Sequence, residues 1–133
     1  SKRLGVEEGL KIDNPVLEFS YKDDALGDPL INDDHAVFLK AATVAEIELI
    51  KQLARRINQL LASYMAERGI ILVDFKLEFG KTADGQIILA DEISPDTCRL
   101  WDKDTKKKLD KDRFRRDLGD VEETYREVFE RIK

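Results

Sequence analysis

The sequence predicts a mixed α/β fold of the α+β type, in which an antiparallel sheet packs against a long amphipathic helix and a C-terminal helix. Three observations predict it. A long helical period covers residues 43–69, two strand-like segments joined by a polar turn cover residues 70–92, and a second helical period covers residues 121–133. Because 133 residues with 42% hydrophobic side chains are sufficient for a core, we expect residues 1–133 to form a single domain.

Composition narrows the function classes. The net charge of −5 provides no overall positive field that would attract nucleic acid, although residues 103–116 are locally basic. Cys98 is the only cysteine, which excludes an internal disulfide and favours a reducing compartment. Residues 1–9 show no signal-peptide pattern, and no apolar run approaches the ~20 residues that cross a bilayer, so we expect a cytoplasmic protein. His35, the only histidine, has no second histidine or cysteine as a metal-ligand partner, so we interpret it as a surface or helix residue.

Short elements are expected before the long helix. Residues 6–9 predict a turn of helix ended by glycine, and residues 16–21 alternate as a strand does. Residues 22–29 form a polar loop with glycine and proline, which by pattern alone is an acidic surface loop. A short helix should follow through Lys40, because the side chains of residues 32–34 can accept hydrogen bonds from its first amides.

The long helix is the clearest secondary-structure prediction. Thr43 and Glu46 have the spacing of a capping box, and apolar residues then recur at helical spacing up to Gly69. A helix of about 25 residues would be about 37 Å long. Its apolar stripe should bury against the sheet; a partner-binding helix is the alternative. The stripe consists of Ile47, Ile50, Leu53, Ala54, Ile57, Leu60, Leu61, Tyr64 and Met65.

Ionisable side chains interrupt the first strand of the expected hairpin. Strand alternation from residue 70 to Gly80 puts Asp74, Lys76 and Glu78 on one face and apolar residues on the other. After a turn at residues 82–85, a second strand from Gln86 to Glu92 should return antiparallel. In any register whose opposed residue numbers add to an odd value, such as Lys76 opposite Asp91, the charged groups converge on one face.

Two carboxylates and an ammonium on one sheet face suit nucleotide chemistry. Carboxylate oxygens bind Mg²⁺ while ATP phosphates and water complete its coordination, and a lysine offers a compact charge for a phosphate. The alternative is the solvated outer face of a half-buried hairpin, with Lys76 paired across the strands to a carboxylate. By pattern alone the second interpretation is favoured.

Several motifs together resemble one family. The segments 72–80, 91–96 and 99–102, within a similarity that extends from residues 2–5 through residues 110–115, resemble phosphoribosylaminoimidazole-succinocarboxamide synthetase (SAICAR synthetase) of purine biosynthesis. Members of that family are longer, with a glycine- and lysine-rich ATP-binding segment and a substrate motif in their amino-terminal half. Neither occurs in this sequence. The resemblance therefore implies the carboxy-terminal part of the enzyme, with the amino-terminal ATP-binding part absent from this chain.

The resemblance implies an ATP-dependent ligase. The expected reaction joins L-aspartate to the carboxylate of carboxyaminoimidazole ribotide (CAIR) and gives the succinocarboxamide, ADP and phosphate, through an acyl phosphate. ATP and Mg²⁺ are the expected cofactors, and CAIR and L-aspartate are the expected partners. We expect no nucleic-acid or membrane partner. A homo-oligomer stays open, as does a subunit contact through the C-terminal helix.

The resemblance also implies the site residues. The expected catalytic and cofactor-binding residues are Lys76, Glu78 and Asp91, of which Glu78 and Asp91 would hold Mg²⁺ and Lys76 would offset charge on the transferring phosphoryl group. The expected substrate-binding residues are Lys22, Asp28, Arg99 and Arg115, with Arg99 on the ribotide phosphate. Asp74 is expected either to take part or only to orient Lys76.

Two other hypotheses stay open. A folded remnant or interaction module would keep the sheet and helices without catalysis, and a ligase for a related carboxylate would prefer another amino acid or ribotide. We expect the 133-residue chain alone to be inactive and the complete polypeptide to be active.

Overall fold

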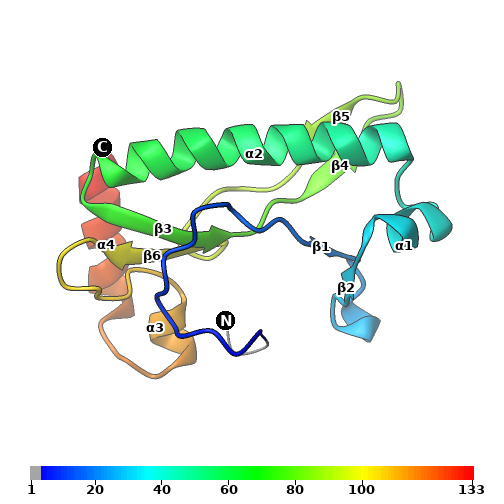
Figure 1. The fold of residues 1–133 in the computed structure, drawn as a ribbon. Coiled ribbons are helices and arrows are strands. Elements are labelled where there is room, and N and C mark those ends of the chain that lie inside the picture. The colour runs from blue at the N-terminus through cyan, green and yellow to red at the C-terminus, as the bar shows by residue number, and fades with distance from the viewer. Residues whose placement is uncertain (1–3) are drawn as a thin grey trace. The chain divides into compact units, whose positions relative to one another are not determined.

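A computed structural model describes residues 4–133, so the expectations that include residues 1–3 lie partly outside it. The chain divides into two compact units, one up to Ile47 and one from Glu48 to Lys133, and each is described by itself. Figure 1 shows the elements in chain order. None of the helices formed by residues 4–133 combines the length and the hydropathy of a membrane-spanning segment.

The first unit contains short elements. They are β1 (Phe19–Ser20), the 3-10 turn η2 (Asp24–Leu26), β2 (Leu30–Ile31), α1 (Asp33–Phe38) and the first residues of α2 (Val44–Ala66). β1 and β2 pair antiparallel, with Phe19 opposite Ile31. The strand expected over residues 16–21 therefore shrinks to two residues, because pairing with β2 covers only those two. Residues 7–10 form a turn, closed by the Leu10 N–H and the Glu7 carbonyl at 3.3 Å.

Both predicted helix starts are confirmed by their caps. The Asn32 side chain accepts from the His35 N–H at 2.9 Å, and His35 Nδ1 accepts from the Asn32 N–H at 3.2 Å. His35 is thus an exposed helix-capping residue, as expected. Thr43 and Glu46 make the reciprocal pair at the start of α2, with distances of 3.2 and 2.9 Å. These bonds satisfy amides that have no partner within the helix.

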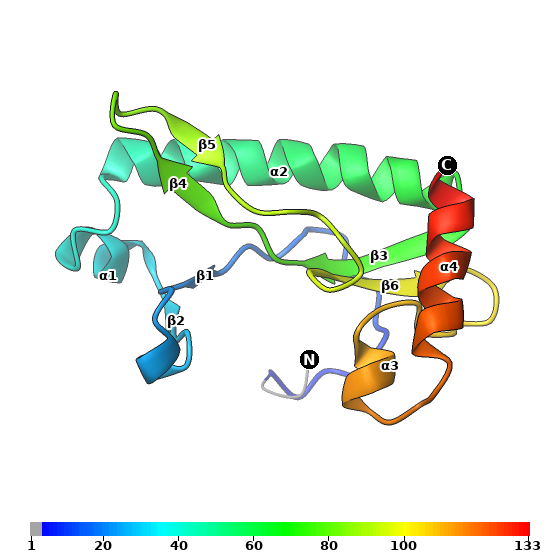
Figure 2. The same cartoon turned by 180° about the vertical axis from the view of Figure 1, so that it is seen from behind.

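The apolar stripe of α2 is only partly buried. Met65 is buried and Leu61 packs against the same core, whereas Leu60 is 55% exposed and Leu53 36% exposed. In the second unit, α2 lies along one side of the β3–β6 pair and α3 lies on the other (Figures 1 and 2). The expectation that the whole stripe buries was therefore too broad, because Ile47 and Met65 are buried whereas the stripe residues between them are half-buried or exposed.

The second unit has two separate antiparallel pairs. β3 (Ile70–Phe75) pairs with β6 (Cys98–Asp102), and β4 (Phe79–Lys81) pairs with β5 (Ile87–Leu89). The expected hairpin exists, but its first strand was predicted as one continuous element and is instead divided after Phe75. The division follows from the pairing: residues before it bind β6, and residues after it bind β5.

The hairpin register differs from the expected one. Phe79 lies opposite Leu89, and the Ala90 N–H donates to the Glu78 carbonyl at 2.8 Å, so pairing continues with Glu78 beside Ala90. The prediction of a register such as Lys76 opposite Asp91 was wrong by one residue. A shift of one residue exchanges the faces of a strand, so alternation no longer brings Asp91 to Glu78.

A β-bulge interrupts β3. Leu72 pairs with Leu100, but Asp74 rather than Val73 pairs with Arg99. Val73 and Asp74 therefore both lie opposite Arg99, the single residue of β6 at this position, and both are exposed. Such an extra residue changes which side chains face the partner strand. Here it puts Asp74 opposite Arg99.

The core lies where α2 ends, between β3, β6 and the C-terminal helix. Its buried members are Met65, Ile70, Cys98, Leu100, Leu109 and Val128. Burial raises the pKa of the Cys98 thiol, so this free cysteine behaves as a small apolar side chain. These contacts connect segments that are distant in sequence. They bury Cys98 and Leu100 of β6, whereas Arg99 between them stays exposed.

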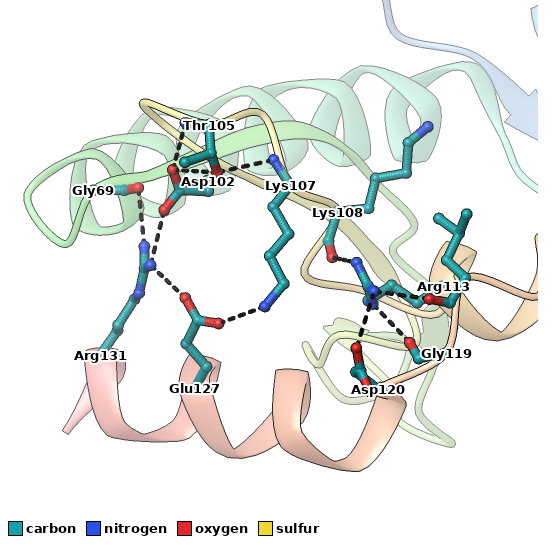
Figure 3. Close-up of polar contacts among 11 residues, drawn as sticks. Gly69, Asp102, Thr105, Lys107, Lys108, Arg113, Gly119, Asp120, Glu127 and Arg131 are labelled. Atoms are coloured by element: carbon teal, nitrogen blue, oxygen red, sulfur yellow. Dashed lines mark hydrogen bonds and ion pairs between the residues drawn. The ribbon is translucent and has the colours of Figure 1, made fainter.

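Polar contacts fasten α4 (Val121–Ile132) to the sheet, as Figure 3 shows. Arg131 donates to the Gly69 carbonyl at 3.3 Å, to Asp102 at 2.8 Å, and to Glu127. Lys107 bonds the other oxygen of Glu127 at 3.1 Å. The predicted closing helix is thereby confirmed, and it is joined to the end of β6.

Arg113 closes the loop before α4. It comes from the short helix α3 (Asp112–Arg115), which the sequence analysis did not predict. Its guanidinium donates to the carbonyls of Gly119 at 2.9 Å and Leu118 at 3.0 Å (Figure 3). The loop therefore returns close to α3 and keeps that helix in position.

Candidate functional site

An arginine and an aspartate meet across the β3–β6 pair. Arg99 Nη1 lies 2.7 Å from Asp74 Oδ2, and the bulge in β3 creates this pairing. The Arg99 side chain stays 46% exposed, so part of the guanidinium faces solvent. Partial burial alone would lower the pKa of Arg99, but the Asp74 and Asp112 carboxylates raise it, so the guanidinium stays charged.

Asp112 gathers three arginines at the start of α3. Its side chain is 6% exposed, and its carboxylate lies 3.2 Å from Arg99 Nε, 3.5 Å from Arg115 Nη1 and 3.8 Å from Arg116 Nη2. Arg99 and Arg115, both predicted as substrate-binding residues, are thus brought together although 16 positions separate them in the sequence. The negative charge lies inside and the guanidinium groups lie towards solvent.

A second buried carboxylate supports Asp112 from behind. Asp110 is 1% exposed and accepts the Asp112 N–H and the Leu100 N–H, both at 2.7 Å. Desolvation raises the pKa of Asp110, and the two backbone donors oppose that shift. The same side chain therefore joins the start of α3 to β6, next to Arg99.

Lys76 and Glu78 form an ion pair between β3 and β4. Lys76 Nζ lies 2.8 Å from Glu78 Oε1, with the lysine side chain 59% exposed and the glutamate 17% exposed. The Lys76 N–H also donates to the Thr97 carbonyl at 2.8 Å. Lys76 and Glu78 were expected on one face of a continuous strand. They do lie close together, but in the segment that connects β3 to β4.

Asp91 lies just beyond the hairpin. It is exposed in a bend after β5, and its Oδ1 accepts the Glu92 N–H at 2.9 Å. Because Glu78 continues the pairing of β4 with β5, both carboxylates belong to the same end of the hairpin. Their carboxylate oxygens are the ligand type that Mg²⁺ prefers, and two suffice where phosphates and water supply the rest. Their joint metal site stays a prediction.

Lys22 and Asp28 both lie in the first unit and are exposed. Asp28 has φ +49° and accepts the Asp23 N–H at 2.9 Å, while the Asp23 side chain accepts the Leu26 N–H at 3.1 Å. These bonds give the polar loop a defined local conformation. The role of both residues in binding substrate stays a prediction.

Tyr125 of α4 reaches the loop before β6. Its hydroxyl donates to Asp96 Oδ1 at 2.6 Å. Desolvation, together with the nearby Asp96 carboxylate, raises the pKa of Tyr125 far above its usual range. The residues after Ser94, which belong to one of the family motifs, are therefore held by the C-terminal helix.

The arginines around Asp112 and the carboxylates of Glu78 and Asp91 suit ligands of opposite charge. The arginines can bind an anionic oxygen group, whereas Glu78 and Asp91 can bind a divalent cation together with other oxygen ligands. No group of three or more His, Cys, Asp and Glu residues that could hold a metal ion occurs among residues 4–133.

Sequence reasoning missed the role of Asp112. Its spacing to Arg115 and Arg116 is that of neighbours on one helix face, but no helix was predicted there. It also left Asp74 as a residue that acts itself or orients Lys76, whereas the structure pairs it with Arg99. Alternation in residues 98–102, with Cys98 and Leu100 buried, could have indicated β6.

Sequence comparisons match nearly the whole chain. A family model described as SAICAR synthetase matches residues 1–132. The phosphoribosylaminoimidazole-succinocarboxamide synthase of Clostridium botulinum (strain Eklund 17B / Type B) is 61% identical over 132 residues, which make up 99% of this chain and 56% of that protein. The protein of the same name from Coprothermobacter proteolyticus is 58% identical with the same coverage. The chain spans about half the length of the curated relatives it matches.

Solved structures agree with these matches. A SAICAR synthetase in complex with ADP has a TM-score of 0.95 and 54% identity, over 99% of this chain and 56% of that one. The SAICAR synthetase of Pyrococcus horikoshii OT3 has a TM-score of 0.93 and 54% identity, over 98% of this chain and 57% of that one. These similarities confirm the predicted α+β fold class and the resemblance based on the motifs. The chain belongs to the SAICAR synthetase family.

Proposed function

We propose that a protein carrying this sequence is an ATP-dependent ligase of purine biosynthesis. It joins L-aspartate to the carboxylate of CAIR and releases SAICAR, ADP and phosphate. The observation that carries the proposal is the match of 99% of the chain to a SAICAR synthetase in complex with ADP, at 54% identity. A more distant relative from Saccharomyces cerevisiae, 26% identical with a TM-score of 0.60, is complexed with SAICAR.

ATP is needed because a carboxylate does not react readily with an amine. Its charge is delocalised, and its oxygen leaves poorly. A CAIR carboxylate oxygen attacks the γ-phosphorus and ADP leaves, which gives an acyl phosphate. The aspartate amine then attacks the acyl carbon, loses a proton, and phosphate departs with the former carboxylate oxygen. Positioning of the reacting groups and stabilisation of charge on the phosphoryl group are the main tasks of the protein.

The arginine cluster is the proposed binding site for the ribotide phosphate. Arg99 is 46% exposed and Arg115 is 53% exposed, and both contact the buried carboxylate of Asp112. A guanidinium can donate several parallel hydrogen bonds, which suits a phosphate group. Arg99 would bind the phosphate, and Arg115 would position the substrate near the reacting groups.

Lys76, Glu78 and Asp91 are the proposed residues for the nucleotide. The Lys76 ammonium, exposed and next to Glu78 at 2.8 Å, would offset charge on the transferring phosphoryl group. Glu78 and Asp91 have the oxygen ligands that fit Mg²⁺, which supplies neutralisation of phosphate charge when bound. Asp91→Asn in the family-length enzyme should weaken the Mg²⁺ dependence, and a variant with normal turnover and normal Mg²⁺ dependence would remove Asp91 from the site.

Lys22 and Asp28 are proposed to contact CAIR or L-aspartate. The support is their place in a loop that resembles the substrate loop of the family, and the hydrogen bond that fixes the Asp28 carboxylate locally. Lys22→Ala should raise the KM for one of the two substrates, and the substrate affected would identify the contact. An unchanged KM for both substrates would remove Lys22.

The activity test compares two polypeptides. ATP, Mg²⁺, CAIR and L-aspartate are added either to the 133-residue chain or to a family-length polypeptide that contains it, and ADP release is followed. The longer polypeptide should turn over and the 133-residue chain should not. Turnover by the 133-residue chain would refute the assignment of ATP-binding groups to the remainder of the family sequence. Failure of the longer polypeptide would refute the proposed function.

A non-catalytic module that keeps this fold is the second candidate; the chain spans 56% of the length of the curated relatives it matches. Such a module would fold without ADP release in either polypeptide. A ligase for a related carboxylate would instead release ADP with a changed amino-acid or ribotide preference.

The proposed compartment is the cytoplasm, which the single unpaired cysteine favours. A homo-oligomer would be detected by sedimentation.

A further inference from the structure

We propose, as an inference that rests on the proposed function, that Asp112 is a positioning residue that holds Arg99, Arg115 and Arg116 together as one anion-binding cluster. Asp112 itself does not touch substrate in this proposal. Its task is to keep three guanidinium groups at a spacing that a single phosphate group can bridge.

The contacts of Asp112 support this role. Oδ2 lies 3.2 Å from Arg99 Nε and 3.8 Å from Arg116 Nη2, and Oδ1 lies 3.5 Å from Arg115 Nη1. One carboxylate therefore contacts arginines from both β6 and the α3 segment. Without it, three positive charges would repel one another and their flexible side chains would separate.

Asp112 is itself held rigidly. Its side chain is 6% exposed, and its N–H donates to the buried Asp110, which also accepts the Leu100 N–H. Leu100 belongs to β6 and follows Arg99 directly. The carboxylate and the strand that carries Arg99 are therefore connected by a short path of 2.7 Å hydrogen bonds, which restricts how far Arg99 can move from Asp112.

The guanidinium groups of the cluster are accessible to a ligand. Each guanidinium has five N–H donors, and the contacts with Asp112 are at 3.2 Å for Arg99 Nε, 3.5 Å for Arg115 Nη1 and 3.8 Å for Arg116 Nη2. Arg99 is 46% exposed, Arg115 is 53% exposed and Arg116 is 46% exposed. Asp74 occupies Arg99 Nη1 at 2.7 Å and orients this guanidinium from the other side.

The charges indicate which ligand fits. Three arginines contact the Asp112 carboxylate, Arg99 also contacts Asp74, and the buried Asp112 carboxylate is on the inner side of the cluster. A compact group with several anionic oxygens, such as the phosphate of a ribotide, can accept from more than one arginine at once. Inorganic phosphate and ribose 5-phosphate are suitable probes, because their comparison separates recognition of the anion from recognition of the sugar.

The first experiment uses Asp112→Asn in the family-length polypeptide. The KM for CAIR should rise at least about tenfold while kcat changes less than about threefold, because the arginines lose the spacing with which they bind the ribotide phosphate, and the phosphate is not one of the groups that react. Asp112→Glu, which keeps the charge, should restore part of the CAIR affinity. Asp104→Asn, in the exposed turn after β6, is the matched control and should change neither constant. An unchanged KM for Asp112→Asn would overturn the proposal, as would a loss confined to kcat.

The second experiment needs no variant and no turnover. With ¹⁵N-arginine label, the Nε–H signal of Arg99 should exchange with water at least about tenfold more slowly than that of Arg126, whose side chain is 77% exposed. Inorganic phosphate and ribose 5-phosphate should shift the signals of Arg99, Arg115 and Arg116 together. Exchange of Arg99 as fast as that of Arg126, or shifts limited to one arginine, would refute a gathered cluster even if Asp112→Asn fails to fold. Loss of turnover by the wild type, with these signals as expected, would refute the proposed function alone.

Discussion

Arg99→Lys separates a binding role from a structural role, because it keeps the charge and removes the planar fork. Arg99 reaches two carboxylates at once, with Nη1 at 2.7 Å from Asp74 and Nε at 3.2 Å from Asp112. A lysine has one ammonium at the end of a flexible stem, so it cannot keep this geometry. Arg99→Lys should therefore weaken binding of the ribotide phosphate by more free energy than it removes from the free energy of unfolding.

The expected stability change is small. Asp74 is 57% exposed and Arg99 46% exposed, so solvent screening limits their ion pair to about 0.2–1 kcal/mol. Asp112 keeps Arg115 and Arg116 as partners after the change. A total loss of about 1 kcal/mol corresponds to a Tm decrease of roughly 3–5 °C for a domain of this size.

The expected binding change is larger. Hydrogen bonds to charged groups contribute about 1.5–3 kcal/mol each, and loss of one such bond to the ribotide phosphate raises the KM roughly 10- to 100-fold. The assay is steady-state turnover of the family-length enzyme at varied CAIR, beside thermal unfolding of the same samples. Arg126→Lys, in an ion pair of which both partners are at least 77% exposed, is the control and should change neither quantity. A normal KM with a Tm decrease above about 15 °C would show that Arg99 is structural.

Three further predictions test the core, the pH dependence and the metal site. Leu100→Ala removes a side chain that is 1% exposed and should lower the free energy of unfolding by about 2–5 kcal/mol in denaturant titrations, whereas Leu118→Ala, 44% exposed at that position, should cost much less. The raised pKa of Tyr125, caused by desolvation and its carboxylate partner, stabilises the folded state below pH 10, the ordinary pKa, and this contribution is lost as the pH rises above it; Tyr125→Phe should therefore show a smaller decrease of unfolding free energy between pH 9 and about pH 11. Glu78→Gln combined with Asp91→Asn should remove Mg²⁺-dependent ADP binding in calorimetric titrations, and unchanged binding would exclude these carboxylates as metal ligands.

The helices and the family could be predicted from the sequence, whereas the strand partners could not. Helical periodicity and caps are local signals, so Asn32 and Thr43 marked helix starts that the structure confirms. Strand pairing joins residues that are distant in the chain. The segment from Ile70 to Phe75 has the same alternation whether it pairs with residues 86–92 or with β6, and the core contacts of Cys98 and Leu100 favour pairing with β6.

The extra residue at Val73 explains why the candidate site was only partly foreseen. Simple alternation assigns every second residue to one face, and it therefore grouped Asp74 with Lys76 and Glu78. The bulge breaks that rule once, which turns Asp74 towards Arg99 and leaves Lys76 and Glu78 to pair between the strands. An insertion of one residue thus divides one expected charged face into two groups, the arginines around Asp112 and the Lys76–Glu78 pair. In the proposed ligase the first group would bind the ribotide phosphate and the second would face the nucleotide.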